Sequence, residues 1–421
     1  MALGQKIDSK AGGPAHGRKK RRSPWVRRIA IAMSIILVIG IAMAGYEYKL
    51  VRDAFNSITG HKNICGPNNV YCKGVLPKQP FNVLAIGSDS REGLTGAEAA
   101  QTGASLVSGQ RSDVIKIFHV DPTKKTIAVV SIPRDTMVTL IENQGLYGTY
   151  NRINVNLGLN GDPSLLVRTI EANFGIQINH VVIVSFAGLI DAVNALGGIK
   201  LQFPYPARDD YSGLRIHSAG CQTLTGIQAL AVARSRHYRY YVNGVAQYDG
   251  TSDFGRIDRQ NQFLRSLIKS AKSKVNPLTI NAFIRALPKG VSIDAKLSFD
   301  DLTRLVLQFR NLDPTALNAQ TLPTAGFTYN SASMLTVEQP MAQEMLVKIF
   351  GQVGTPGGLV QPTNPPPVNQ SLATPPPPVV TTTTTPPTTT TTNPTGTTAP
   401  TTTTTTPQHT EPWYTFNPTS C

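Results

Sequence analysis

The chain has 421 residues, enough for two or three domains, but its composition changes along its length. Residues 352–421 hold 16 of the 31 prolines and 25 threonines, with a single acidic side chain, Glu411. Such a segment cannot bury an apolar core, which excludes a domain there and predicts a disordered Pro/Thr-rich tail over 352–421.

The net charge of +15 invites a nucleic-acid interpretation, so its location matters. Residues 1–28 hold nine Lys or Arg and one Asp, and therefore carry +8. They contain Gly12-Gly13-Pro14 and show no apolar periodicity, so they cannot form a helix-turn-helix. We expect no nucleic-acid partner.

An uncharged segment, IAIAMSIILVIGIAMAGY, follows this basic block at residues 29–46. Its length reaches the lower range for a membrane-spanning helix, and basic flanks stay cytoplasmic. We therefore predict a basic cytoplasmic tail over 1–28, a single-pass membrane anchor over 29–46 and an extracytoplasmic remainder that begins with a stalk over 47–78. The rival is a signal peptide cleaved after Ala42-Met43-Ala44; the anchor is favoured because the apolar run exceeds a signal-peptide core.

Four cysteines fit this oxidising location. Cys65 and Cys72 lie close together in CGPNNVYC, and we predict a small-loop disulfide rather than a metal site, since no His or Cys partners cluster nearby. Cys221 and Cys421 are left unassigned, and either could be a free thiol.

Residues 79–351 read as one domain in which strands alternate with helices. Its apolar, β-branched and capped segments predict strands over 81–86, 114–120, 126–132, 181–184 and 199–203, and helices over 162–174, 186–196 and 256–274. The turn at 121–125 makes the second and third strands a hairpin. The fold class is α/β, with a mixed sheet covered on both faces.

The helix over 256–274 has an apolar face that includes Ile257, Phe263 and Leu267. Arg256 and Gln260, four residues apart, share a different face. A solvated helix face is the default explanation for such a polar pair, and a binding site is the alternative.

Acids and arginines gather where predicted strands begin or end. Asp89 and Arg91 follow the first strand, and Arg111 and Asp113 open the second. Paired carboxylates suit Mg²⁺, which takes one or two protein carboxylates together with phosphate and water oxygens. Surface turns with local Asp–Arg pairs are the other explanation, and spacing alone favours them slightly.

Further arginines, at positions 134, 234, 236, 256 and 259, suit phosphate because the guanidinium fork matches its oxygens. Arg234 and Arg236 can reach one ligand only if the helix that begins near Thr225 ends around Ala233. Asp253-Phe254-Gly255 matches a kinase signature by chance, because the other kinase motifs are absent.

Five strings occur in a characteristic order: NVLAIGSDSREG, RSDVIKIFHVDPTKKTIAVVSIPRDT, NRINVNLG, QTLTGIQALAVARSRH and DFGRIDRQNQFL. Together they resemble the LytR-CpsA-Psr family of bacterial cell-wall enzymes over about residues 80–350. The resemblance implies a three-layer α/β/α domain with a hydrophobic tunnel for a lipid. It also implies a membrane-anchored phosphotransferase that moves a glycan from a polyprenyl-pyrophosphate carrier onto a peptidoglycan hydroxyl.

By the same resemblance, Asp89 and Asp113 hold Mg²⁺ (or Mn²⁺), and Arg134, Asp89 and Asp113 are the catalytic residues. The pyrophosphate-binding residues are Arg111, Arg134, Arg234, Arg236 and Gln260, with Arg256 and Arg152 as weaker matches. The chain departs from the family pattern in a polar insertion between Asp89 and Arg111, which is a mobile flap or an idle loop. Two other functions stay open: a polyprenyl-pyrophosphate pyrophosphatase without transfer, and a membrane-bound transcriptional attenuator.

Overall fold

The computed structural model describes residues 43, 45–56, 64, 72, 74, 79–91, 93–94, 96–102, 112–142, 144–157, 162–273, 290–309, 311–351 and 416–421. The chain divides into two compact units, Met1–Leu50 and Val51–Cys421. In the first unit, residues 45–50 are helical. The predicted anchor over 29–46 lies almost wholly outside the described residues, among which no helix is long and apolar enough to cross a membrane.

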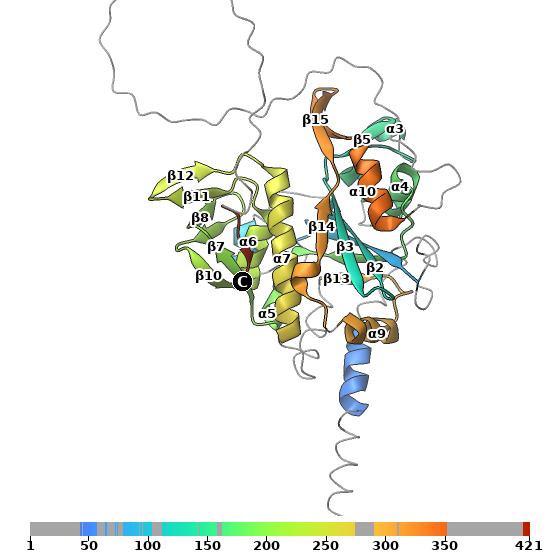
Figure 1. The fold of residues 1–421 in the computed structure, drawn as a ribbon, viewed down its shortest axis with the longest axis horizontal. Helices are drawn as coiled ribbons and strands as arrows, with labels where there is room; N and C mark the ends of the chain where they lie inside the picture. Colours follow the sequence, from blue (N-terminus) through green and yellow to red (C-terminus); the bar gives the residue numbers. More distant parts are fainter. Residues whose placement is uncertain are drawn as a thin grey trace, which may run out of the picture. The chain divides into compact units, whose positions relative to one another are not determined.

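The second unit is built on a six-stranded mixed sheet in the order β13-β6-β1-β2-β3-β14 (Figure 1). β1 pairs antiparallel with β2 and parallel with β6, and β2 and β3 form the predicted hairpin. The β3–β14 pair is parallel and the β6–β13 pair antiparallel. The strands are β1 (Phe81–Ser88), β2 (Ser112–Asp121), β3 (Thr126–Ile132), β6 (His180–Val184), β13 (Val291–Ile293) and β14 (Asn318–Thr321).

One face of this sheet buries the largest apolar cluster. Leu84 and Ile86 of β1 and Ile115 and Ile117 of β2 alternate onto it, as a strand period of two requires. The helices α4 (Ser164–Phe174) and α10 (Met341–Phe350) contribute to the same cluster and cover the face (Figure 1). The helical segment predicted to end at Gly175 does so, because Gly175 adopts the left-handed conformation at its C-cap.

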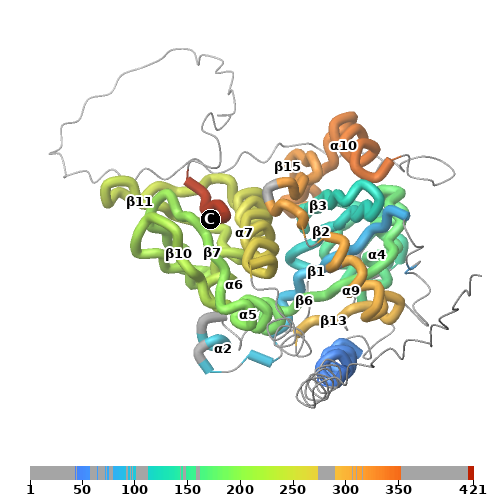
Figure 2. The backbone as a smooth tube through the Cα atoms, turned by 60° about the horizontal axis from the view of Figure 1, so that its bottom comes forward, coloured from blue at the N-terminus to red at the C-terminus, as the bar shows by residue number. Residues whose placement is uncertain are grey.

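The long helix α7 (Asp253–Ser273) lies on the other side of the sheet, between it and a smaller region of short strands and two helices (Figures 1 and 2). That region has two sheets, ordered β10-β7-β17 and β12-β11-β8-β9. The elements here are α5 (Phe186–Ala195), β7 (Ile199–Phe203), β8 (Ala207–Asp209), β9 (Leu214–Ile216), β10 (Gly220–Leu224), α6 (Gly226–Arg234), β11 (Arg239–Val242), β12 (Val245–Tyr248) and β17 (Thr419–Ser420). The strand predicted over 199–203 is therefore present, but it lies in the three-stranded sheet and not in the six-stranded one.

Short elements connect these parts. They are α2 (Gly96–Thr102), β4 (Met137–Thr139), α3 (Gln144–Tyr147), β5 (Tyr150–Arg152), the 3-10 helix η2 (Ile153–Asn156), α9 (Phe299–Phe309), the 3-10 helix η4 (Pro314–Ala316), β15 (Thr324–Tyr329) and β16 (Ala332–Val337). Val51 and Phe55, from the predicted stalk, pack with Val291 and Phe299.

The last six residues, Phe416–Cys421, form what we call the C-terminal clip. β17 pairs antiparallel with the edge of β7, and Cys421 forms a disulfide with Cys221. Phe416 stacks on Tyr240 with ring centroids 5.0 Å apart. The predicted tail over 352–421 therefore does not extend to the chain end; its remainder lies outside the described residues.

The remaining cysteine prediction is only partly visible. Cys72 is buried and disulfide-bonded, whereas Cys65, its expected partner, lies outside the described residues.

The burial of α7 differs from the expectation. Its polar residues Arg256, Arg259 and Gln260 are buried, whereas the apolar Leu267 is only half-buried. The helix is enclosed by the sheet on one side and by α6 and β7 on the other, so its polar face is not solvated. The default explanation for the Arg256–Gln260 pair is therefore wrong.

Candidate functional site

Asp113 is positioned by an irregularity in the sheet. Gly87 pairs with Val114 and Ser88 with Ser112, so Asp113 is an extra residue on β2, a β-bulge. A Cβ atom at Gly87 would lie 2.8 Å from the Cβ of Val114, so the close approach of the strands requires glycine. The bulge lies at the end of the sheet where β2 begins, and it changes the direction of the Asp113 side chain.

Arg134, just beyond β3, meets this carboxylate. Its Nη1 donates to Asp113 Oδ1 at 2.6 Å, and its Nε lies 3.4 Å from Asp135 Oδ2. Arg152, at the end of β5, extends the chain of charges, with its Nε 3.5 Å from Asp135 Oδ1. Two sequence-predicted arginines are thus joined through a carboxylate that was not predicted.

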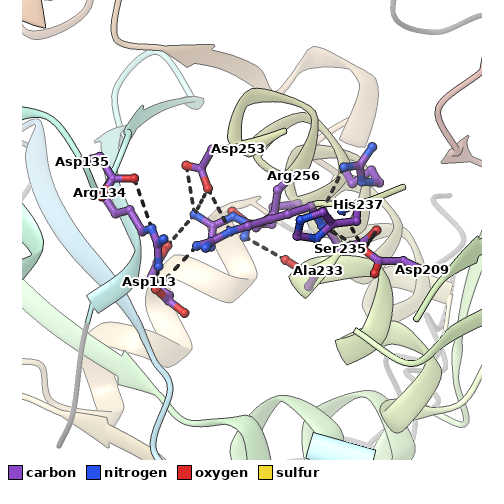
Figure 3. A network of polar contacts seen from close by, with 12 residues as sticks. Asp113, Arg134, Asp135, Asp209, Ala233, Ser235, His237, Asp253 and Arg256 are labelled. Carbon is purple, nitrogen blue, oxygen red and sulfur yellow. Dashed lines mark hydrogen bonds and ion pairs between the residues drawn. The ribbon is translucent and has the colours of Figure 1, made fainter. Parts of the chain in front are cut away.

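The end of α6 supplies Arg234 and Arg236. The helix ends at Arg234, as the two-residue spacing required. The buried Asp209 carboxylate accepts hydrogen bonds from the Arg236 and His237 backbone N–H groups and from Ser235 Oγ, which holds the turn after the helix (Figure 3). Arg236 Nη2 then lies 3.7 Å from Asp113 Oδ1, while the Arg234 guanidinium stacks over the Phe186 ring.

The first turn of α7 completes the group. Arg256 Nη2 donates to the backbone oxygen of Asp113 at 2.9 Å and lies 2.9 Å from Asp253 Oδ1. Arg236 Nε lies 3.1 Å from the same Asp253 oxygen. Figure 3 shows Asp113, Arg134, Asp253 and Arg256 gathered at one place.

We call this group the arginine cluster; it comprises Asp113, Arg134, Asp135, Arg152, Arg236, Asp253 and Arg256. Four guanidinium groups share three carboxylates, so the cluster has a positive excess. Nε of Arg256 has no hydrogen-bond acceptor among the described residues, and Nε of Arg134, Arg152 and Arg236 lie 3.1–3.5 Å from carboxylate oxygens of Asp135 and Asp253 without hydrogen-bond geometry. The positive excess and these poorly directed N–H donors mark the cluster as a site for an anion that supplies oxygens.

The electrostatics agree with this assignment. Burial raises the pKa of Asp113, but Arg134, Arg256 and Arg236 together outweigh it and hold that pKa below its usual value. Burial lowers the pKa of Arg256 to about 10, with a contribution from the like charges of Arg236 and Arg134. An added anion would relieve this mutual repulsion.

The other predicted site residues stand as follows. Gln260 lies one turn after Arg256 and donates from its side-chain amide to the Ala233 oxygen at 3.0 Å. Asp89 directly follows β1 and is half-buried, at the same end of the sheet as Asp113. Arg111 and most of the insertion after Asp89 lie outside the described residues.

Three residues escaped the sequence reasoning. Asp253 was set aside with the kinase-like triplet, although its i,i+3 spacing to Arg256 was a readable signal. Asp135, next to Arg134 in SIPRDT, was readable in the same way. Lys116 lies inside a strand that otherwise reads as apolar, and its charge was the one signal available.

The described residues contain no group of three or more His, Cys, Asp or Glu that could hold a metal ion on its own. The site fits a metal ion that is held partly by protein carboxylates and partly by the phosphate oxygens of a substrate. Asp113 is kept ionised, and Mg²⁺ needs only one or two carboxylates when substrate phosphates complete its shell. The residues present therefore fit a Mg²⁺ ion that arrives with a phosphate ligand.

The LytR_cpsA_psr family model matches residues 52–350. The polyisoprenyl-teichoic acid–peptidoglycan teichoic acid transferase TagU of Enterococcus faecalis is 28% identical over 326 residues, which are 77% of this chain and 97% of that protein. The transferase TagV of Bacillus subtilis is 29% identical over 282 residues, 65% of each chain.

Among solved structures, the LytR-Csp2A-Psr enzyme from Actinomyces oris aligns with 66% of this chain and 95% of its own, with 21% identity and a TM-score of 0.51. This similarity shows the α/β fold. Because the family model spans most of the chain, including every residue of the arginine cluster, the chain belongs to the LytR-CpsA-Psr family.

Proposed function

We propose that this chain is a phosphotransferase that moves a glycan from a polyprenyl-pyrophosphate carrier onto a peptidoglycan hydroxyl, forming a phosphodiester. The observation that carries the proposal is the positive excess of the arginine cluster, in which four guanidinium groups share three carboxylates. The family relatives TagU and TagV are named as teichoic acid transferases that act between polyisoprenyl-linked teichoic acid and peptidoglycan.

The chemistry divides among residues of this chain. Phosphoryl transfer depends mainly on positioning and on cancelling the charge that develops on the phosphate oxygens. Arg134, Arg236 and Arg256 approach one point from β3, α6 and α7, so their guanidinium groups would hold the pyrophosphate from different sides. The polyprenyl phosphate that leaves would be stabilised by the same cations.

A bound Mg²⁺ would supply further cancellation of phosphate charge. Asp113 would hold it, with Asp89 as the second carboxylate. The depressed pKa of Asp113 suits it to a cation and makes it a poor proton acceptor. We therefore assign the role of accepting the sugar hydroxyl proton to Asp89 rather than to Asp113, which requires that one carboxylate oxygen of Asp89 does not bind the metal.

The lipid would lie along the sheet face that turns toward α7. Val83 and Ala85 of β1 and Val114 and Phe118 of β2 belong to this face, and all four are only partly buried. Apolar surface of this kind gains about 25 cal/mol for each Å² that a lipid covers. We place the reaction at the outer surface of the cell membrane, with residues 29–46 as the anchor.

The test is to incubate the full chain in detergent with a polyprenyl-pyrophosphate-linked glycan, Mg²⁺ and peptidoglycan. We expect radiolabelled glycan to become covalently attached to the peptidoglycan and polyprenyl phosphate to be released. Release of free phosphoglycan without any attached label would instead identify a pyrophosphatase. Omitting peptidoglycan is the matched control, because transfer requires the acceptor and hydrolysis does not.

A further inference from the structure

The exposed face of the small four-stranded sheet, ordered β12-β11-β8-β9, carries a line of arginines. Arg239 of β11 is directly opposite Arg208 of β8, and Arg208 is directly opposite Arg215 of β9. Residues directly opposite each other in antiparallel strands share one face of the sheet, and all three side chains are exposed. Tyr248 of β12, opposite Arg239, is 47% exposed. We call these four residues the arginine row.

The charges of the arginine row are not balanced. Asp210 is the one carboxylate that pairs with it in the described part of the chain, 2.8 Å from Arg208 Nε and 2.6 Å from Arg215 Nη2. No described carboxylate forms an ion pair with Arg239. Like charges directly opposite each other in a sheet are destabilising, so the stability of the fold does not explain three arginines in register. The row keeps a positive excess that an anionic ligand would neutralise.

The two faces of this sheet differ. Tyr240 of β11 stacks on Phe416 of the C-terminal clip, so the clip covers the face opposite to the arginine row. Because side chains alternate along a strand, the neighbouring Tyr241 shares the face of the row, where it interacts electrostatically with Arg208. Sugar rings pack on aromatic rings, and guanidinium groups bind carboxylate oxygens in pairs. Arginines beside tyrosines therefore suit a sugar polymer that carries carboxylates.

The arginine row is linked to the arginine cluster by one carboxylate. Asp209 directly follows Arg208 and accepts hydrogen bonds from the backbone N–H groups of Arg236, a member of the cluster, and of His237 (Figure 3). Asp209 also accepts from the backbone N–H of Tyr211, in the turn after β8. The Tyr211 ring, 76% exposed, lies against the His237 ring with centroids 4.3 Å apart. The turn beside the row is thus joined to the loop that carries Arg236.

We infer that the arginine row binds the acceptor peptidoglycan through the carboxylates of its peptide stems and so brings a sugar hydroxyl near the arginine cluster. The inference rests on the proposed function, which makes peptidoglycan the acceptor. The donor is already held through its lipid and its pyrophosphate, whereas the acceptor needs a surface of its own. Neighbouring strands lie about 4.8 Å apart, so the row spans about 14 Å, which suits a polymer better than a small anion.

The experiment is co-sedimentation of the full chain, in detergent and without any donor, with purified insoluble peptidoglycan. The test variant removes the three charges of the row: Arg208→Gln, Arg215→Gln and Arg239→Gln. The matched control removes three exposed charges from the β2–β3 turn and α9: Lys124→Gln, Lys125→Gln and Arg304→Gln. A second sample of peptidoglycan, with its carboxylates amidated, tests the chemistry of the ligand.

We expect the test variant to bind peptidoglycan about tenfold more weakly than the wild-type chain, since each exposed charged contact contributes a factor of about two. The wild-type chain and the control variant should bind alike, and both should bind amidated peptidoglycan as weakly as the test variant does. The test variant should unfold at or above the wild-type temperature, because like charges are removed. Arg239→Gln alone, which breaks no ion pair with a described carboxylate, should weaken binding about twofold.

Equal binding by the wild-type chain and the test variant would overturn the inference and leave the proposed function intact. If that variant also needed more lipid-linked donor for transfer, the row would bind the donor glycan instead. Weaker binding by the test variant, together with no transfer by the wild-type chain, would count against the proposed function and leave the row as a peptidoglycan-binding surface.

Discussion

Arg256 and Arg259 lie on the same helix, three residues apart, and belong to two regions that differ in charge balance. Arg256 shares its carboxylate with Arg236 in a cluster that has more cations than anions. Arg259 is completely buried and pairs with a carboxylate of its own, Asp249, at 2.6 Å. It also donates to Asn417 of the C-terminal clip and to the Ser235 oxygen, and stacks on the Tyr238 ring.

The difference teaches how to separate a binding arginine from a structural one. Residue type, helix and burial are nearly the same for both. What differs is charge balance: Arg259 is neutralised by Asp249, while the arginine cluster is left with a positive excess. A balanced buried ion pair belongs to the fold, whereas an excess of one charge stabilises a ligand of the opposite charge.

The largest expected effect comes from exchanging the two arginines separately for methionine. Arg259→Met should lower the free energy of unfolding by about 3–5 kcal/mol, because it leaves Asp249 buried without its cation. Arg256→Met should change it by about 1 kcal/mol or less, since Asp253 keeps Arg236. Chemical denaturation measures both. Equal losses in the two variants would remove the distinction between the regions.

Arg134→Ala tests whether the arginine cluster contributes to the reaction rather than to the stability of the fold. Removing a charged donor aimed at the reacting phosphate should lower the transfer rate about 100- to 1000-fold, with thermal unfolding almost unchanged. The matched control is Arg168→Ala, since Arg168 forms an ion pair with Glu142 outside the cluster. Turnover retained in Arg134→Ala would show that the cluster is structural after all.

Removing the Cys221–Cys421 disulfide tests whether the C-terminal clip contributes to stability without contributing to the transfer rate. Cys421→Ser removes a cross-link between residues 200 positions apart, and the free energy of unfolding should fall by about 2–5 kcal/mol. Below the unfolding transition the transfer rate should stay near wild type, because the clip forms hydrogen bonds with Tyr238, Arg259 and Lys269, which are not members of the cluster. A large loss of rate at full folding would show that the two regions are coupled.

The smallest effect concerns Asp258, which lies on α7 between the two arginines. Burial raises the pKa of Asp258 to about 6, against the lowering effect of Arg259 and Lys116. The folded protein thus binds this proton more tightly than the unfolded chain does. Its contribution to stability is present below about pH 4 and is lost as pH rises through 6.

Asp258→Asn should therefore be more stable than wild type above pH 6 by about 1 kcal/mol, a figure reduced for partial exposure to solvent, and the difference should shrink toward pH 4. Thermal unfolding at both pH values measures this. A variant less stable than wild type at pH 7 would mean that the Asp258 charge supports its neighbours more than burial penalises it.

Much of the central fold was predictable from local signals. The β2–β3 hairpin and the helix ending at Gly175 follow from strand alternation, the turn at 121–125 and a helix-stop residue. The strand at 199–203 was predicted too, but its sheet partner β17 comes from the far end of the chain, which no local pattern indicates.

The site was predictable as a set of arginines and carboxylates and not as a geometry. Arg134, Arg236 and Arg256 come together only because a bulge turns Asp113 and a carboxylate cap ends α6 at Arg234. The pairing of Cys221 with Cys421 and the burial of Lys116 depend on contacts across the fold. Contacts between residues far apart in the chain produce no periodic pattern of residue types, so the sequence alone does not predict them.

The C-terminal clip also gives the chain a ring-like covalent topology. Residues 352–415 join Gly351, at the end of α10, to Phe416, and the Cys221–Cys421 bond returns the far end to the same unit. A single protease cut within this segment would therefore leave both fragments joined, and they would separate on a denaturing gel only after reduction.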